Sequence, residues 1–140
     1  MINSRSLLDL DGDVQDLAHK FISHCDAVGI DLLVTSTYRD FACQAATYAQ
    51  GRSTPGTIVT KAKAGQSWHN WRRALDVVPL RNGKPIWDVH EPIWAQIGLI
   101  GQEVGFEWAG SWRHFPEFPH FQHLDGRTLD DMLAKYPQGL

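Results

Sequence analysis

The stretch Ser67–Pro79, which reads SWHNWRRALDVVP, places one acidic residue inside an apolar run. Residues 73–79 are rich in apolar and β-branched side chains, and they predict a β-strand. Asp76 stands within that strand, where burial of a carboxylate costs free energy unless the group is paired or binds a metal. Two interpretations stay open at this point: an ion pair, for instance with Arg39, or a metal ligand together with His69, seven residues earlier.

Around this strand, hydrophobic periodicity and turn residues predict further helices and short strands. The predicted helices run from Asp11 or Asp13 to just before Gly29, and over residues 40–50, 91–104 and 128–136. The other predicted extended segments cover residues 31–36, 85–87, 106–108 and 120–124, with a hairpin turn at 81–84 and a long loop at 51–66. This order predicts an α+β fold with a small antiparallel sheet flanked by helices.

Length and composition indicate one compact domain over residues 1–140. The net charge of −3 argues against a nucleic-acid binder, which usually presents a basic face. No apolar run approaches the roughly 20 residues of a membrane span, so stable membrane insertion is not expected. The first residues, MINSRSLLDLDGD, lack a long apolar region, so no signal peptide is predicted. Cys25 and Cys43 are expected to be reduced, and a monomer is the default expectation.

Residues 112–123 hold a second group of polar side chains that suit a site. Two prolines in this segment forbid a regular helix, so we expect it to run extended with side chains alternating between faces. His120 and Gln122 then share one face, whereas His123 points to the other. We therefore expect His120, rather than His123, to join a metal centre. Glu117, three residues before His120 and across a proline kink, can approach the same centre from another angle.

Two imidazoles and one carboxylate form a ligand set that suits one catalytic zinc ion. His69, Asp76 and His120 supply three ligands, which leaves a fourth position for water. Zinc lowers the pKa of bound water to about 7, and a neighbouring carboxylate can then accept the proton. Glu117 is the candidate for this general base.

The motifs that carry these residues resemble the VanY-type (M15) D,L-peptidases. This family includes D-Ala-D-Ala carboxypeptidases and dipeptidases, and phage endolysins that are L-alanyl-D-glutamate endopeptidases. The similar elements are Ser67-x-His69 followed by Ala74-x-Asp76, then Glu117-x-Pro119-His120, together with residues 36–44 (STYRDFACQ) and 105–112 (GFEWAGSW). The resemblance implies a Hedgehog/DD-peptidase-like fold with the zinc site on the sheet.

The same resemblance implies roles for single residues. It makes His69, Asp76 and His120 the ligands of one zinc ion and Glu117 the general base. Arg39 would face the substrate and stabilise negative charge.

Three more residues are expected to line the site or support it. Ser67 would support the ligands by hydrogen bonding, and Gln44 and Trp112 are further candidates for substrate binding or support.

One position departs from the family, because Arg72 stands where a glycine usually follows the first ligand histidine by three residues. A glycine there often marks positive φ or close backbone approach.

We therefore expect a zinc-dependent peptidoglycan hydrolase of the endolysin branch, without a separate cell-wall-binding module. Its expected reaction is cleavage of the L-Ala–D-Glu bond of the stem peptide, which lyses the bacterial host. A small enzyme of this kind would wait in the host cytoplasm until a holin opens the membrane, and would then act on the wall in the periplasm. A D-alanyl-D-alanine carboxypeptidase or dipeptidase with the same chemistry is the alternative, and a non-catalytic wall-binding domain is a third hypothesis.

Overall fold

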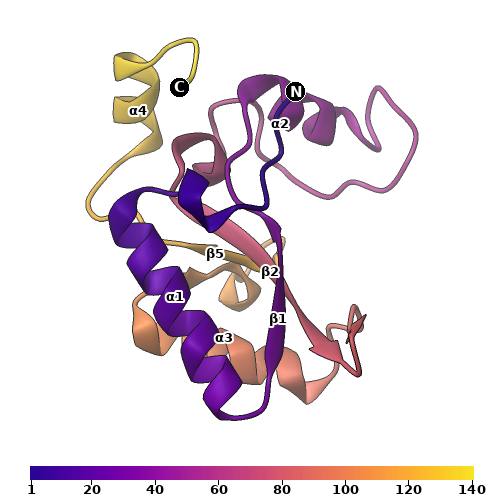
Figure 1. The fold of residues 1–140 in the computed structure, drawn as a ribbon. Helices are drawn as coiled ribbons and strands as arrows, with labels where there is room; N and C mark the ends of the chain where they lie inside the picture. The colour runs from indigo at the N-terminus through magenta and orange to yellow at the C-terminus, as the bar shows by residue number, and fades with distance from the viewer.

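The computed structural model describes all residues from 1 to 140 (Figure 1). The helices are α1 (Gly12–Ala27), α2 (Phe41–Ala49), α3 (Pro92–Val104) and α4 (Leu129–Lys135), with short 3₁₀ turns η1 (Leu7–Asp9), η2 (Trp68–Trp71) and η3 (Ala109–Ser111). The strands are β1 (Asp31–Ser36), β2 (Ala74–Arg81), β3 (Lys84–Pro85), β4 (Glu107–Trp108) and β5 (His120–Gln122). Every helix and strand expected from the sequence is present, within a few residues of its expected bounds.

The strands form one antiparallel sheet in the order β1-β2-β5-β4, and β3 extends β2 as a short hairpin. The hairpin turns at Asn82 and Gly83, which both have positive φ, as the Asn-Gly signal predicts. Central in the sheet, β2 pairs with β5 so that Asp76 lies directly opposite His120. The α+β prediction is therefore confirmed, and the sheet itself brings together two residues that are 44 positions apart in sequence.

The main core lies between the sheet and the helix pair α1 and α3, which pack together along one side of the sheet (Figure 1). Apolar residues recur along α1 at helical spacing and are fully buried, for example Val14 and Phe21. Leu75 and Val77 of β2 belong to this core. Because side chains alternate along a strand, Asp76 between them faces the other side of the sheet.

A second, smaller cluster supports the site from the end of the molecule where α2 and α4 lie (Figure 1). Trp68, Trp71 and Ala74 form its buried centre, and side chains from α2 and α4 pack around them. Trp71 is 1% exposed and donates a hydrogen bond from its indole nitrogen to the carbonyl of Gly65. The tryptophans around His69 therefore act as packing residues that hold η2 in place.

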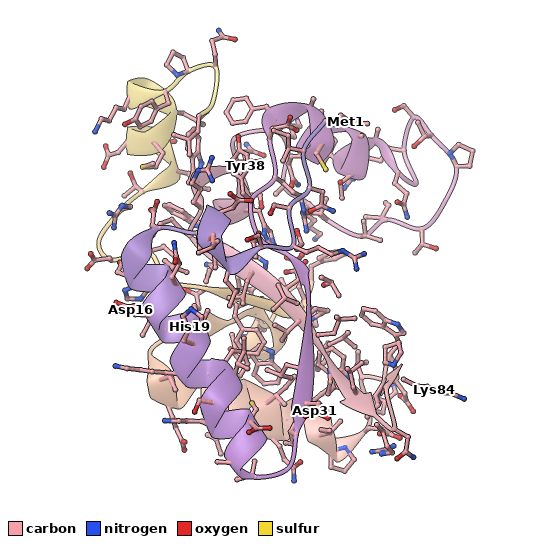
Figure 2. The ribbon with its side chains drawn as sticks, viewed as in Figure 1. Met1, Asp16, His19, Asp31, Tyr38 and Lys84 are labelled. Carbon is pink, nitrogen blue, oxygen red and sulfur yellow. The ribbon has the colours of Figure 1, made fainter.

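The outer surface carries the polar residues that the sequence places outside the core. Asp16 and His19 project from the exposed side of α1, and Lys84 projects from the β3 hairpin (Figure 2). Cys25 and Cys43 are both free thiols, as expected. None of the helices combines the length and the apolar character that crossing a membrane requires.

The expectation that residues 112–123 run extended throughout is wrong for most of the segment. Only His120–Gln122 forms a strand, while the preceding residues turn back on themselves. Phe115 adopts a left-handed φ of 48°, and the amide of Glu117 donates to the carbonyl of Ala109. The prolines exclude a helix, as argued, but they also favour turns, which return the loop to η3.

One fully buried arginine joins the start of α1 to the sheet. The side chain of Arg73 is 0% exposed and donates to both carboxylate oxygens of Asp13, at 2.6 and 2.9 Å. It also contacts Asp11 at 3.2 Å and donates to the carbonyl of His123 at 2.9 Å. Hydrogen bonding to Arg73 lowers the pKa of the Asp13 carboxyl below its ordinary value of 3.8.

We expect Asp13→Ala to lower the free energy of unfolding at neutral pH by about 2 kcal/mol, because it removes two charge-assisted hydrogen bonds from the buried Arg73 guanidinium. Urea unfolding measures the effect, and Asp16→Ala, on the exposed side of the same helix, is the matched control. Since the folded-state pKa of Asp13 is depressed, its contribution is complete above pH 3.8 and is lost as the pH falls through the folded-state value. A loss no larger than that of Asp16→Ala would contradict the assignment.

Candidate metal centre

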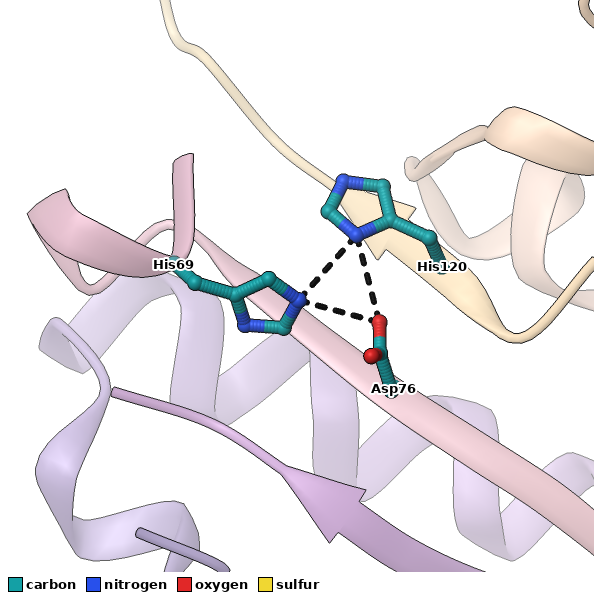
Figure 3. A group of neighbouring side chains, drawn as sticks. All are labelled: His69, Asp76 and His120. Carbon is teal, nitrogen blue, oxygen red and sulfur yellow. Dashed lines mark hydrogen bonds and ion pairs between the residues drawn. The ribbon is translucent and has the colours of Figure 1, made fainter. Parts of the chain in front are cut away.

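Three side chains from separate elements converge on one point (Figure 3). His69 comes from η2, whose N-cap Ser67 accepts a hydrogen bond from the His69 amide at 3.3 Å. Asp76 comes from β2 and His120 from β5. Asp76 Oδ1 lies 3.0 Å from His69 Nε2 and 3.2 Å from His120 Nδ1, and these two nitrogens are 3.1 Å apart.

Hydrogen bonds on the far side of each ring determine which nitrogen faces the centre. His69 Nδ1 lies 2.7 Å from the carbonyl oxygen of Thr37, which only accepts, so this nitrogen carries the proton. His120 Nε2 donates in the same way to the amide oxygen of Gln122 at 2.8 Å. In the neutral rings, two nitrogen lone pairs and one carboxylate oxygen therefore point at a common centre. Such an arrangement is repulsive unless a proton or a metal cation lies between them.

The donor set and its spacing fit a metal ion. Bonds of 2.0–2.1 Å in a tetrahedral zinc site place ligand atoms about 3.3 Å apart. The three donor separations of 3.0 to 3.2 Å come close to this spacing. His69 and His120 also hold their second ring nitrogens by hydrogen bonds, as metal-binding histidines usually do. The residues present could thus hold one ion.

The electrostatics of the centre favour positive charge. Burial alone would raise the pKa of Asp76, but the neighbouring histidines hold it well below its ordinary value. Burial lowers the pKa of His69. At His120 burial acts in the same direction, but the hydrogen bond and charge of Asp76 outweigh it and raise the pKa of that ring. Because protons and a metal ion compete for the same donors, we expect metal binding to weaken at low pH.

Arg39 holds the other oxygen of Asp76. Its guanidinium donates to Asp76 Oδ2 at 3.1 Å, to Ser36 Oγ at 3.1 Å and to Gln44 Oε1 at 3.1 Å. The two interpretations of Asp76 are thus compatible, since one oxygen pairs with Arg39 while the other faces the histidines. Arg39 also lines the cavities described below, so its charge faces the space where a substrate would lie.

Two cavities, of about 350 Å³ and about 400 Å³, meet at the centre. Arg39, Glu117 and His120 line both of them. Burial raises the pKa of the Glu117 carboxyl above its ordinary value, which makes it a stronger proton acceptor once ionised. Trp112 forms a wall of the first cavity, with its ring 5.9 Å from the His120 ring.

The remaining sequence-predicted residues support the centre and are not among its metal donors. Ser67 lines the first cavity and caps η2. Gln44 is fully buried and lines neither cavity; its amide nitrogen donates to the carbonyl of Ala62 at 2.8 Å. It therefore joins Arg39 to the long loop. His123 is not part of the metal-ligand group.

Arg72 adopts the left-handed conformation that the usual glycine suggested, with φ 60° and ψ 28°. Its guanidinium stacks on the Tyr38 ring at 4.0 Å and donates to the carbonyl of Asp9 at 2.8 Å. These contacts compensate for a conformation that costs a non-glycine residue free energy. The side chain lies against the amino-terminal segment and lines neither cavity, so access to the centre is kept.

A hydrogen-bonded chain behind His120 was not foreseen from the sequence. The amide oxygen of Gln122 accepts the hydrogen bond from His120, and the amide nitrogen of Gln122 donates to Glu107 Oε2 at 3.1 Å. The indole nitrogen of Trp112 donates to the same oxygen at 2.8 Å. Because a carboxylate only accepts, Glu107 fixes the orientation of the Gln122 amide and thereby the tautomer of His120.

We expect Glu107→Ala to weaken zinc affinity about tenfold, since the Gln122 amide can then flip and no longer holds the His120 proton. Competition with a coloured chelator measures the affinity. Glu103→Ala removes an exposed carboxylate from nearby α3 and serves as the control. Equal affinities for the two variants would show that Glu107 does not orient the ligand.

An antiparallel sheet with two histidines and an aspartate around one point, and a half-buried glutamate in the adjoining cavity, is an arrangement that suits a metallopeptidase. Residues 60–123 match the model of an M15 peptidase family, which is described as D-alanyl-D-alanine carboxypeptidase. The resemblance drawn from the sequence motifs is thereby confirmed.

Two curated relatives are similar in sequence. The peptidoglycan L-alanyl-D-glutamate endopeptidase CwlK of Bacillus subtilis is 36% identical over 104 residues, which cover 69% of this chain and 62% of the relative. The L-alanyl-D-glutamate peptidase of Listeria phage A118 is 27% identical over 123 residues, covering 85% of this chain and 41% of the relative. The chain thus spans less than two thirds of either relative.

Solved structures show the same fold. The L-Ala D-Glu endopeptidase ChiX of Serratia marcescens superposes with a TM-score of 0.65 at 21% identity, covering 97% of this chain and 92% of that one. The vancomycin-resistance D,D-pentapeptidase VanY, in complex with Zn(II), gives a TM-score of 0.60 at 14% identity, with 89% and 78% covered.

Proposed function

We propose that the chain is a zinc-dependent peptidoglycan hydrolase that cleaves the L-Ala–D-Glu bond of the stem peptide. The observation that carries the proposal is the convergence of His69, Asp76 and His120 beside Glu117 in a cleft. Both curated relatives carry names with this activity, which supports the choice of bond.

The residues of the site divide the chemistry between them. Bound zinc would supply a Lewis acid that polarises the scissile carbonyl and acidifies water. The Glu117 carboxylate accepts a proton from the attacking water and returns it to the leaving amine. Arg39 places positive charge on the wall shared by both cavities, where it stabilises the negative charge that develops on the carbonyl oxygen.

The shape of the cleft favours an endopeptidase. Two cavities share Arg39, Glu117 and His120 in their walls and differ in the rest of their lining, which leaves room for more than one substrate residue beside the reacting bond. The second candidate function is that of a D-alanyl-D-alanine carboxypeptidase, which the description of the matched family model supports.

Mass spectrometry of digested muropeptides tests the choice of bond. The proposal predicts glycan fragments that end in L-Ala and peptides that begin with a free D-Glu amine. Release of D-Ala without these products would assign the carboxypeptidase instead. A protein that binds zinc stoichiometrically but turns over no wall substrate would be a non-catalytic wall-binding domain.

We propose further that the chain acts as a phage endolysin, a role supported by its similarity to the Listeria phage enzyme. It would then stay in the host cytoplasm until a holin permeabilises the membrane, and attack the wall from the periplasm. Expression with and without a co-expressed holin tests this role. Lysis only with the holin is the expected result, and rapid lysis without it would contradict the proposal.

A further inference from the structure

The two cavities beside the metal centre differ in charge. Arg39 and Glu117 line both, but the first cavity adds Lys61 and the imidazole of His114, whereas the second adds Asp76. One side of the cleft therefore offers an ammonium group beyond the shared Arg39, and the other side adds no basic side chain.

The second cavity adds several apolar side chains to its wall, beside Arg39, Asp76 and Glu117. Ile58 and Val59, from the long loop, line it and are 42% and 44% exposed, so their apolar surface is open to a bound group. Val89 and Phe118 line the same cavity. This side suits a small apolar group better than a charged one.

Lys61 lies on a segment of the long loop that is held in place. The carbonyl of Ala62 accepts from Gln44 at 2.8 Å, and the amide of Ala62 donates to Thr60 Oγ1 at 3.1 Å. The Lys61 ammonium lies 5.3 Å from the centre of the Phe115 ring, across the cleft. Lys61 forms no salt bridge with any carboxylate of the chain. Its charge is therefore free to bind an anionic group in the first cavity.

The proposed substrate has one acidic residue at the reacting bond. In the stem peptide, D-glutamate continues the chain through its side chain, so its α-carboxylate stays free on the carbon next to the scissile nitrogen. The alanine on the other side of the bond carries only a methyl group. The charge difference between the two cavities matches this difference between the two residues.

Resting on the proposed function, we propose that Lys61 binds the free α-carboxylate of the residue that supplies the scissile amine. The acidic residue then occupies the first cavity, and the alanine methyl lies against the apolar wall of the second. Lys61 thereby selects substrates whose D-glutamate is a free acid over those in which it is the amide.

The test compares Lys61→Met with Lys63→Met on two synthetic muropeptides that differ only in a free or amidated D-glutamate α-carboxylate. Lys63 is exposed on the same loop, lies 5.8 Å from the Tyr48 ring and lines neither cavity, so it is a matched control. Steady-state kinetics give kcat and KM for each pair, and thermal unfolding confirms that all proteins are folded.

We expect the unsubstituted protein and Lys63→Met to have a higher kcat/KM on the muropeptide with the free α-carboxylate than on the amidated one. Lys61→Met should lose about tenfold in kcat/KM on the acid, mainly through KM, and change little on the amide. Equal losses on both substrates, no loss, or the same loss in Lys63→Met would each overturn the role of Lys61. If the unsubstituted protein cleaved neither substrate, the proposed function itself would fail, a result distinct from a failure confined to Lys61→Met.

Discussion

Glu117→Gln should lower the rate of peptide hydrolysis about a thousandfold while leaving zinc binding intact. The amide keeps the size of the side chain and its place in both cavities, but it cannot accept the proton of the attacking water. Glu117 is not among the three metal donors, so the ligand set remains complete. Release of muropeptide fragments gives the rate, and metal analysis of the purified variant gives the zinc content.

Glu103→Gln is the matched control for this substitution, because it makes the same change at an exposed position of α3. It should hydrolyse the wall as the unsubstituted protein does. Undiminished hydrolysis by Glu117→Gln would remove Glu117 from the mechanism. Loss of zinc together with activity would instead place Glu117 among the ligands.

His120→Ala should abolish both stoichiometric zinc binding and activity. It removes one of three donors, and it also leaves the amide of Gln122 without the ring nitrogen that it holds. Thermal unfolding with and without zinc makes the metal effect visible. At a zinc concentration about a thousand times the dissociation constant, binding stabilises the folded state by about 4 kcal/mol. For a domain of this size, that raises the melting temperature by about 10 °C.

The expected pattern is a zinc-dependent rise in melting temperature for the unsubstituted protein and none for His120→Ala. His123→Ala is the control, because His123 is close in sequence yet is not part of the metal-ligand group. It should keep the zinc-dependent rise. An equal rise in His120→Ala would show that the ion binds elsewhere.

The sequence predicted the centre because each of its residues leaves a local signal. Asp76 is conspicuous as a carboxylate inside an apolar strand, and strand alternation distinguishes His120 from His123. Arg72 stands where the family usually has a glycine, and its left-handed backbone shows why a glycine suits this position. Local periodicity also predicted the helices and most strands.

Other features depend on pairings that no local pattern reveals. Glu107 reaches Gln122 only because β4 and β5 pair with these two residues opposite each other. The left-handed φ of Phe115 and the turns before His120 follow from a loop that must return to η3, which the prolines permit without specifying. The charge difference between the cavities likewise arises where the long loop meets residues more than 50 positions away, as Lys61 meets Phe115.

Cleavage of one defined muropeptide by metal-free and zinc-restored protein tests the central claim most directly. Chelator treatment, checked by metal analysis, should stop the release of fragments ending in L-Ala, and one equivalent of zinc should restore it. Cleavage that continues unchanged in protein shown to be free of metal, or no cleavage of this bond after zinc is restored, would contradict the account.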